Sequence, residues 1–359
     1  MTRASDDSAS HGTEALAAAL GARHLGRPQA LDRLCAPDAP APRCVSVWPT
    51  PAPEALGPYA AAGGRALVCR PPQDEGALAA LAGAADAAGV TLLLVDDTRL
   101  ALARLTRRFD RRPALAAPGV HPAAWVDPSA RLGVDVRVGP GAVVGPGAEL
   151  GDGVTVAALA SVGAACRVGA ETTLHERVVL ADGVVLGARC RLQAGATIGA
   201  DGFGYASGPR GAERIHHLGG VVIGDDVEVG ANSCVDRGTL EPTRIGDRTK
   251  IDNLVQVGHN VQIGSDVIIA GCCAIAGSVR LEDGVVLGGG VAIADHVRVG
   301  AGAQLAGRSG VTKDVPAGAV WGGFPAQPLR GWVRERYLLG RLETLWRAHL
   351  GRGEGDREA

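Results

Sequence analysis

The sequence predicts a mainly β protein: a left-handed parallel β-helix built on a six-residue repeat, with a small N-terminal α/β domain and a C-terminal helix. The first observation behind this prediction is an aliphatic residue at every sixth position from Val120 to Ile198. The period resumes at Ile223 and continues, after one shift of phase, to Val311. The second observation is a scarcity of large rings, with three Phe, three Tyr and five Trp beside 53 Gly. Such a core is filled by aliphatic side chains in a narrow, regular space, which favours a repeat architecture.

A period of six fits neither a helix of 3.6 residues per turn nor a simple alternating strand. It fits a triangular coil with three flat sides, each of which sends one aliphatic residue inward. Glycine commonly follows that residue, as in Val138-Gly139 and Ile263-Gly264, where we expect a tight corner to need a backbone without a Cβ. Three hexapeptides make a coil of about eighteen residues, so about ten coils stack at roughly 4.8 Å each.

Two interruptions of the period predict loops that project from the coil stack. The longer one lies between Ala200 and Ile223 and carries Phe203 and Tyr205, and the shorter one is Leu240–Thr243. An insertion in a coil stack points outward, where it can line a cleft between subunits. The two aromatic residues have two open interpretations, contact with a ligand or packing within a trimer.

The flanking regions lack the period. Residues 1–115 alternate Ala/Leu-rich helical stretches (Glu14–Leu25, Gly76–Ala88) with short apolar runs (Arg65–Cys69, Val90–Val95), which predicts a small α/β domain.

The β-helix is expected over residues 116–318, and residues 319–359 form a C-terminal extension. Within that extension, Leu329–Leu350 has apolar residues at helical spacing and many arginines. We expect a helix that covers the open end of the solenoid. Its arginines are interpreted either as a solvated face or as a contact for an acidic protein.

Composition excludes several classes of protein. Lys+Arg numbers 36 against 38 for Asp+Glu, so we expect neither a nucleic-acid partner nor a polybasic membrane anchor. The first Ala/Leu run is too short for a signal peptide or an integral membrane segment. Eight cysteines without a CxxC pair predict a reduced, cytoplasmic protein. No His or Cys spacing suits a catalytic metal, and no phosphate-binding glycine motif or nucleophile elbow is present.

The coil geometry sorts the nine histidines. His259 lies two residues after an inward valine, Gly277 follows eighteen residues later, and His296 nineteen after that, which predicts a rough column along one edge of the prism. A histidine is suited to take a proton from an attacking amine or hydroxyl. The Gly277 amide can donate to the oxyanion of a tetrahedral intermediate, and His296 can position a phosphate or hydroxyl of the substrate.

Other polar residues are expected near this column or on the projecting loop. Those near the column are Asp252, Asn253, Gln256 and Asn260. His216 and His217 lie on the long loop and are expected to make contacts rather than to catalyse.

The segments IGADGFGYA, TKIDNLVQVGHNVQIG, IAGCCAIAGS and GGFPAQP resemble the UDP-3-O-(3-hydroxyacyl)glucosamine N-acyltransferases of lipid A synthesis, roughly from Gly119 to Trp332. The resemblance implies that His259 is the general base for the glucosamine 2-amine and that the Gly277 amide serves the oxyanion. It implies further that His296 contacts substrate and that Asp252 and Asn253 border the sugar site.

The resemblance also implies the partners. The donor is a 3-hydroxyacyl group on the phosphopantetheine arm of acyl carrier protein, so the enzyme needs no cofactor of its own. The chain forms a homotrimer with active sites between adjacent subunits. The family stacks the uracil of its UDP-sugar substrate between aromatic side chains of the N-terminal domain, and here only Trp48 and Tyr59 are available for this contact.

Two alternatives remain open at the level of the sequence. The first is another hexapeptide sugar N- or O-acyltransferase that uses acetyl- or acyl-CoA, which would keep His259 but need neither UDP nor a carrier protein. The second is a non-catalytic β-helical scaffold in which the histidine column is incidental.

Overall fold

The computed structural model describes residues 11–323 and 329–349, with the side chains of residues 329–333 and 349 left undescribed. The chain divides into two units, Met1–Pro113 and Ala114–Ala359. The GGFPAQP motif and both of its prolines lie largely outside the described residues.

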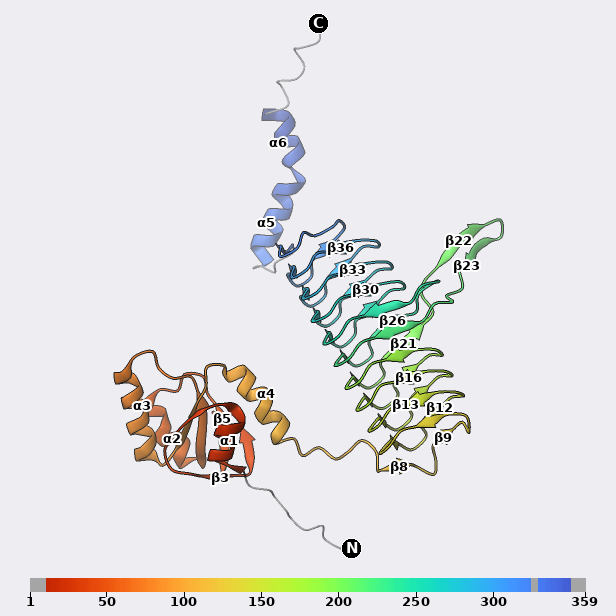
Figure 1. Cartoon of the computed structure of the whole chain (residues 1–359). Helices are drawn as coiled ribbons and strands as arrows, with labels where there is room; N and C mark the ends of the chain where they lie inside the picture. Colours follow the sequence, from red (N-terminus) through yellow and green to blue (C-terminus); the bar gives the residue numbers. More distant parts are fainter. Residues whose placement is uncertain (1–10, 324–328, 350–359) are drawn as a thin grey trace. The chain divides into compact units, whose positions relative to one another are not determined.

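The second unit is a coil stack with three parallel sheets of nine, ten and eleven strands (Figure 1), which confirms the predicted left-handed parallel β-helix. Most strands have two residues, and each pairs with the strand one coil further on. Thus β11 (Arg137–Val138) pairs with β14 (Thr155–Val156), eighteen residues later. The eleven-stranded sheet runs from β8 (Gly119–Val120) to β39 (Val320–Trp321), and the nine-stranded sheet from β10 (Arg131–Leu132) to β36 (Arg298–Val299).

The ten-stranded sheet carries most of the groups discussed below. Its strands are β9 (Trp125–Val126), β12 (Val143–Val144), β15 (Ser161–Val162), β18 (Val179–Leu180), β21 (Thr197–Ala200), β26 (Cys234–Asp236), β29 (Gln256–Val257), β32 (Ala274–Ile275), β35 (Ala292–Ile293) and β38 (Gly310–Val311).

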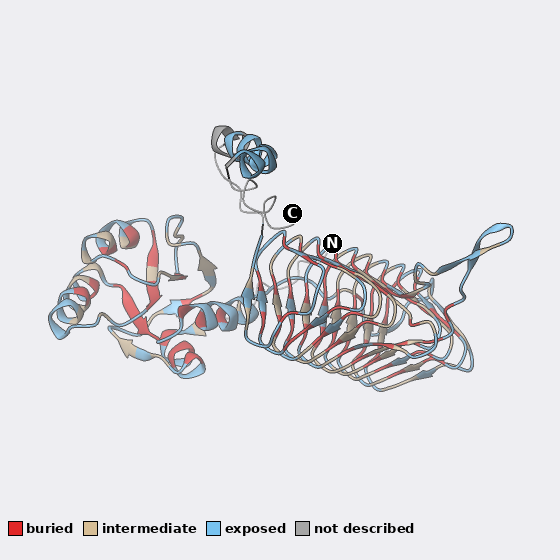
Figure 2. Ribbon diagram, turned by 90° about the horizontal axis from the view of Figure 1, so that it is seen from above, coloured by how far each residue is buried: buried red, intermediate tan, exposed pale blue. Residues whose placement is uncertain are grey.

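The second residue of nearly every strand points into one continuous core of Val, Leu and Ile, drawn in red in Figure 2. The first coil is less covered, since Val120 at its open end is 47% exposed. Glycine follows the inward residue for a different reason from the tight corner that the sequence predicted. At Gly139 a Cβ would lie 2.9 Å from the backbone nitrogen of Ala158 in the next coil, so close stacking of the coils, not the turn itself, requires glycine there.

Both predicted insertions leave the stack while the coils on either side stay paired, with one register shift between Ile198 and Ala200 where the long insertion begins. Across the long one, Leu186 pairs with Ile223, so the sheet continues as if the extra residues were absent. The long insertion forms an antiparallel hairpin of β22 (Tyr205–Gly208) and β23 (Gly211–Arg214), which projects from the solenoid (Figure 1). The sequence predicted the projection but not the hairpin.

The first unit has a five-stranded sheet in the order β2-β7-β6-β5-β4. Its strands are β2 (Arg23–Leu25), β4 (Arg33–Cys35), β5 (Cys44–Val47), β6 (Gly64–Cys69) and β7 (Thr91–Leu94), and β2 alone is antiparallel to its neighbour. A separate two-stranded pair joins β1 (His11–Gly12) and β3 (Ala30–Leu31).

Helices cover both faces of this sheet, which confirms a small α/β fold. One face packs on α1 (Thr13–Leu20) and α4 (Thr98–Arg108), and the other on α2 (Leu56–Ala61) and α3 (Glu75–Ala88), with a 3-10 turn at Pro53–Ala55. Alternate strand residues divide between the two faces: Val68 belongs to the first and Leu67 to the second.

The C-terminal extension contains two helices, α5 (Leu329–Gly340) and α6 (Leu342–His349), where one was predicted. All described side chains of residues 334–348 are exposed. The expected covering of the open solenoid end therefore stays a prediction. No helix in the described ranges is long and apolar enough to cross a bilayer.

Candidate active site

One cavity of about 690 Å³ lies where the long insertion meets the ends of four successive strands of the ten-stranded sheet, β26, β29, β32 and β35. Of the nine predicted site residues, six line it: Phe203, Tyr205, Gln256, His259, Gly277 and His296. Asp201, Arg214, Asp236 and Asp295 supply the charged groups of its wall. The structure thus brings the two loop aromatics together with the histidine column.

The column is real but its register differs by one residue from the expectation. Residues two positions after the inward residue stack in line, and these are His259, Gly277 and Asp295. His296 instead occupies the next position, a left-handed corner with φ of 60°. The coils are joined there by hydrogen bonds from Ser278 N to His259 O (2.9 Å) and from His296 N to Gly277 O (3.1 Å).

His259 lies directly over Gly277. A Cβ on Gly277 would come within 2.7 Å of the imidazole Nε2 and Cε1, so the ring can occupy this position only above a glycine. None of the described residues accepts a hydrogen bond from the Gly277 amide. A ring nitrogen and a free backbone donor are therefore close together at the wall of the cavity.

The hydrogen bonds of Asn260 decide which nitrogen of His259 carries the proton. Asn260 Oδ1 accepts from the backbone amide and the hydroxyl of Thr239, both at 3.0 Å, and its Nδ2 donates to Glu241 O at 3.0 Å. Since this oxygen can only accept, His259 Nδ1, at 3.0 Å from it, must be the donor. The neutral imidazole then presents an unprotonated Nε2 on the side of Gly277.

The short insertion, Leu240–Thr243, holds Asn260 in the position from which it orients His259. Besides the carbonyl of Glu241, Thr243 accepts a hydrogen bond at its Oγ1 from Asn260 N at 2.9 Å. The Leu240 side chain at the tip is 74% exposed, as expected for a projecting bulge. The bulge thus holds the residue that orients His259.

The long insertion closes the cavity from another side. Phe203 is 84% exposed and packs edge-to-face on Tyr205, with ring centroids 5.1 Å apart. Asp201 pairs with Arg214 at 2.6 Å, which ties the start of the insertion to the end of the hairpin. These contacts hold two aromatic rings at the rim of the cavity.

Asp252 and Asn253 do not belong to this cavity. They form the corner before β29, whereas His259 follows that strand. The Asn253 side chain accepts a hydrogen bond from Ala231 N at 2.6 Å, and Asp252 accepts one from Asn253 N at 2.7 Å. Both have structural partners at the neighbouring edge of the prism.

The N-terminal aromatics differ from each other. Tyr59 is 3% exposed, and its hydroxyl donates to Ala66 O at 2.8 Å, so it is a core residue and is unsuited to stack on a base. Trp48 is partly buried against the same side of the sheet. Only Trp48 remains as a candidate for uracil contact.

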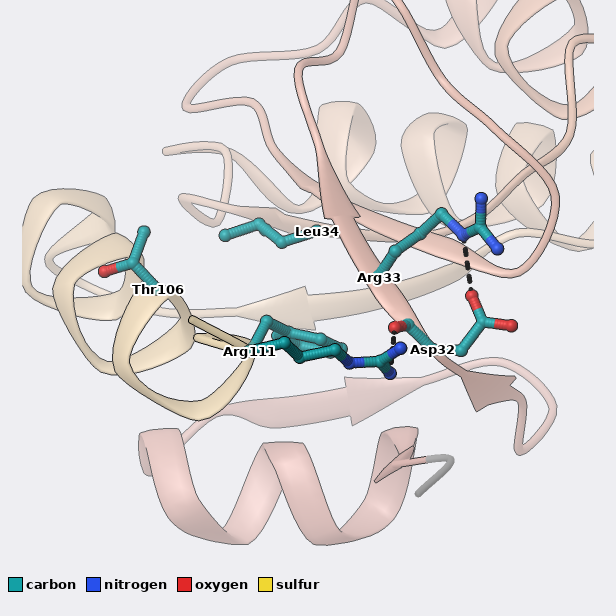
Figure 3. Close-up of a pocket in the computed structure, with 6 residues that line it drawn as sticks. Asp32, Arg33, Leu34, Thr106 and Arg111 are labelled. Carbon is teal, nitrogen blue, oxygen red and sulfur yellow. Dashed lines mark hydrogen bonds and ion pairs between the residues drawn. The ribbon is translucent and has the colours of Figure 1, made fainter. Parts of the chain in front are cut away.

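A second hollow, of about 520 Å³, lies in the first unit between β4 and the end of α4 (Figure 3). Its two guanidinium groups are already bonded to Asp32: Arg33 Nε to the carboxylate at 2.8 Å and Arg111 to the backbone carbonyl at 2.6 Å. Because both guanidinium groups already bind Asp32, they are better explained as a link between the sheet and the end of α4 than as a site for an anion. Among the described residues, no group of His, Cys, Asp and Glu is arranged to hold a metal ion.

Two family profiles match the coil stack. The family described as bacterial transferase hexapeptide (six repeats) matches residues 242–277. The family described as hexapeptide repeat of succinyl-transferase matches residues 130–158, 160–200 and 220–253. The β-helix is thus similar to hexapeptide-repeat transferases over these residues.

Two curated relatives of this chain share one name. UDP-3-O-acylglucosamine N-acyltransferase of Methylobacterium nodulans is 47% identical over 158 residues, which are 44% of this chain and 45% of that protein. UDP-3-O-acylglucosamine N-acyltransferase 2 of Rhodopseudomonas palustris is 49% identical over 174 residues, 48% of this chain and 46% of that protein. The chain thus matches just under half the length of these relatives, and over that part the predicted resemblance is confirmed.

This chain is also similar to a solved structure. UDP-N-acetylglucosamine O-acyltransferase of Moraxella catarrhalis is 23% identical, with a TM-score of 0.46 over 65% of this chain and 85% of that one.

Three residues at or beside the cavity were missed or undervalued from the sequence: Asn260, Asp236 and Asp295. Asn260 was noted only as a polar neighbour. Asp295 lies 36 residues after His259, which is two coils of eighteen residues. Applying the eighteen-residue coil length twice therefore points to Asp295, and His296 is the residue after it. Asp236 ends the strand one coil before that of His259. The four-residue insertion lies between these two strands, so their paired residues are 22 rather than 18 positions apart, and the eighteen-residue spacing does not identify Asp236.

Proposed function

We propose that this protein is an N-acyltransferase that moves a 3-hydroxyacyl group from acyl carrier protein to the 2-amine of UDP-3-O-(3-hydroxyacyl)-glucosamine, with His259 as general base. The observation that carries the proposal is the unprotonated Nε2 of His259 beside the unbonded amide of Gly277 in a cavity of suitable size. The names of the relatives supply the substrate class.

The chemistry follows from these two groups. His259 Nε2 takes a proton from the amine as its nitrogen attacks the thioester carbonyl, and the Gly277 amide donates to the oxyanion of the tetrahedral intermediate. When the C–S bond breaks, His259 returns the proton to the departing thiolate. Nitrogen gains the acyl group, the carrier leaves as a free thiol, and the base is restored.

The remaining residues receive roles in substrate binding. Gln256 and His296 line the cavity and are placed to contact the sugar, while Phe203 and Tyr205 offer apolar surface to the acyl chain or to a neighbouring subunit. Trp48 is the proposed contact for uracil. Asp252 and Asn253 are proposed to border the sugar site only across a subunit boundary, since they lie at another corner of the prism.

We further propose a homotrimer in the cytoplasm. Three large apolar side chains near the site are widely exposed in the single chain: Phe203 (84%), Leu218 (77%) and Leu240 (74%). Packing between copies would cover them. All eight cysteines are unpaired, which suits a reducing compartment.

Acyl carrier protein is proposed as an acidic partner for the arginines near the C-terminus. Arg341 stacks on Tyr337 and Arg347 pairs with Glu343, and both are exposed. These local contacts leave the alternative, a solvated helix face, to be decided by experiment.

The deciding assay measures acylation of UDP-3-O-acyl-glucosamine with carrier-bound and CoA-bound donors in parallel. We expect product from the carrier-bound 3-hydroxyacyl donor. Transfer from acetyl-CoA alone, with no use of the carrier-bound donor, would favour another hexapeptide sugar acyltransferase. No transfer from either donor to any amino or hydroxy sugar would favour the scaffold.

A further inference from the structure

A second histidine is buried behind the proposed base. His217 is 4% exposed, and its ring packs edge-to-face on that of His259, with centroids 5.1 Å apart and planes at 62°. Neither of its ring nitrogens has a hydrogen-bond partner among the described residues. Buried polar atoms without a partner are rare, so this ring is expected to have a function beyond filling space.

The glycines of the DGFGY loop exist to make room for these two rings. A Cβ on Gly202 would lie 2.8 Å from His217 Nε2 and 2.8 Å from His259 Cβ, and one on Gly204 would lie 3.0 Å from His217 Cε1. The loop therefore presses both imidazoles against the end of the sheet. Their mutual position is fixed by backbone on one side and by the coils on the other.

A carboxylate completes the cluster. Asp236 is half-buried at the end of β26 and lines the cavity. Burial raises the pKa of its carboxyl group, while a hydrogen bond from Gln256 and the nearby charges of protonated His259 and His217 oppose that rise. Asp236 lines the same cavity as His259, and the pairing of Val235 with Val257 places it beside Gly258, although the hydrogen bond at His259 Nδ1 goes to the neutral Asn260.

We propose that the Asp236 carboxylate is the counter-charge of protonated His259, and that the buried His217 ring holds His259 in place beside it. The inference rests on the proposed function, in which His259 carries a proton from amine attack until thiol departure. During that interval the imidazolium sits in a partly enclosed site, where a nearby carboxylate stabilises it more than in water. The neutral amide of Asn260 thus orients the His259 ring, and the separate carboxylate of Asp236 compensates its positive charge.

The other titratable groups around the cavity are less able to fill this role. Asp201 is bonded to Arg214 at 2.6 Å, so its charge is compensated. Asp295 and His296 lie three coils from Asp236 and are exposed. Asp236 is the carboxylate that is both uncompensated by an arginine and sheltered from solvent.

The main test is Asp236→Asn, which keeps the shape and removes the charge. We expect kcat to fall about 10- to 100-fold with little change in KM, and the acid limb of the kcat/KM profile to move to lower pH, because His259 loses a group that favours its protonated form. Asp266→Asn, which removes an exposed partner of Arg248 far from the cavity, is the matched control and should keep the wild-type rate and profile.

Thermal unfolding separates this role from a structural one. An acid whose pKa is raised by folding destabilises the protein once it ionises, above its folded pKa. Asp236→Asn should therefore unfold at neutral pH at the same or a higher temperature than wild type. A wild-type rate and profile, or a lower rate accompanied by a lower Tm and an unchanged profile, would overturn the proposal.

Two variants test the part of His217. His217→Phe keeps a ring of similar shape and should retain activity within about threefold, whereas His217→Ala should lose about tenfold, because His259 can then leave its position over Gly277. Equal losses in both variants would show that the ring nitrogens act themselves and would overturn the supporting role. His259→Ala in the same assay separates failure of the proposed function from failure of this inference. Full activity of His259→Ala would refute the proposed function. An inactive His259→Ala together with a fully active Asp236→Asn would refute only the inference about Asp236.

Discussion

Six corners of the β-helix are closed by a side chain of the following coil, whereas other corners among the described residues have no such acceptor, among them the corner at His259 and Gly277, called the open corner below. At a closed corner, an Asp or Asn oxygen accepts a hydrogen bond from the backbone amide two residues after the inward residue. The six donor–acceptor pairs are Val134–Asp152, Ala164–Asp182, Ala188–Asp225, Asp225–Asp247, Ala231–Asn253 and Ser265–Asp283.

At the open corner the same positions hold different residues. His259 is the residue whose amide would be capped, and the capping position one coil later is Gly277, which has no side chain. The Gly277 amide in turn has Asp295 at the capping register, but no hydrogen bond joins them. The open corner therefore differs from the closed ones in two ways: no described side chain accepts from the Gly277 amide, and a histidine lies directly over that glycine.

The largest expected effect comes from removing the base at the open corner. His259→Ala should lower kcat/KM by about 10²- to 10⁴-fold, the usual contribution of a general base, without changing the oligomeric state. Steady-state acyl transfer and size-exclusion chromatography measure both. The exposed His216 is the control, and His216→Ala should retain the wild-type rate. Near-wild-type activity of His259→Ala would show that another group removes the proton.

Gly277→Ala tests whether the open corner needs glycine for space. The new Cβ would lie 2.7 Å from the His259 ring, so the ring must move and the base is misplaced. We expect a loss of about 10²-fold in kcat, since a displacement of about 1 Å has this effect on a positioned group. Gly289 occupies the same place in its hexapeptide and has only ordinary contacts there, so Gly289→Ala should be active. Equal activity of both variants would contradict the close packing of His259 on Gly277.

Asn260→Ala leaves the Gly277 amide of the open corner unchanged but removes the hydrogen bond that orients His259. The change leaves His259 Nδ1 and the Thr239 amide without their acceptor. We expect a loss of about tenfold in kcat from a mixture of imidazole tautomers, and a lower Tm, because each unsatisfied buried group costs about 1–3 kcal/mol. NMR of ¹⁵N-labelled histidine reports the tautomer, and an unchanged signal for His259 would disprove the orienting role of Asn260.

The fold was predictable because the repeat is a local signal that continues for many coils. Each aliphatic residue from Val138 to Ile198 reaches the core at the predicted position, since one residue per side is a requirement of the coil itself. The C-terminal extension, in contrast, was predicted as one helix and has a break at Arg341, because amphipathic spacing continues across a short turn.

The site was predictable where it follows the coil and unpredictable where it depends on insertions. Gly277 lies under His259 because both keep the eighteen-residue register. His217 reaches the same place from a loop whose path has no period, so its burial could not be foreseen. Asp252 and Asn253 are near His259 in sequence but at another corner, which shows that proximity along a coil is a poor guide when each side turns the chain.

The smallest expected effect on catalysis belongs to a closed corner. Asp182→Ala removes the acceptor of the Ala164 amide, at 2.7 Å, and exposes that amide to water. Because a charge-assisted hydrogen bond at a partly exposed position contributes about 1 kcal/mol, the free energy of unfolding should fall by about that amount while kcat and KM stay as in wild type. Chemical denaturation beside the acyl-transfer assay measures both quantities. If Asp182→Ala lowered activity without lowering stability, closed corners would take part in function, and the contrast between the closed corners and the corner at His259 and Gly277 would be wrong.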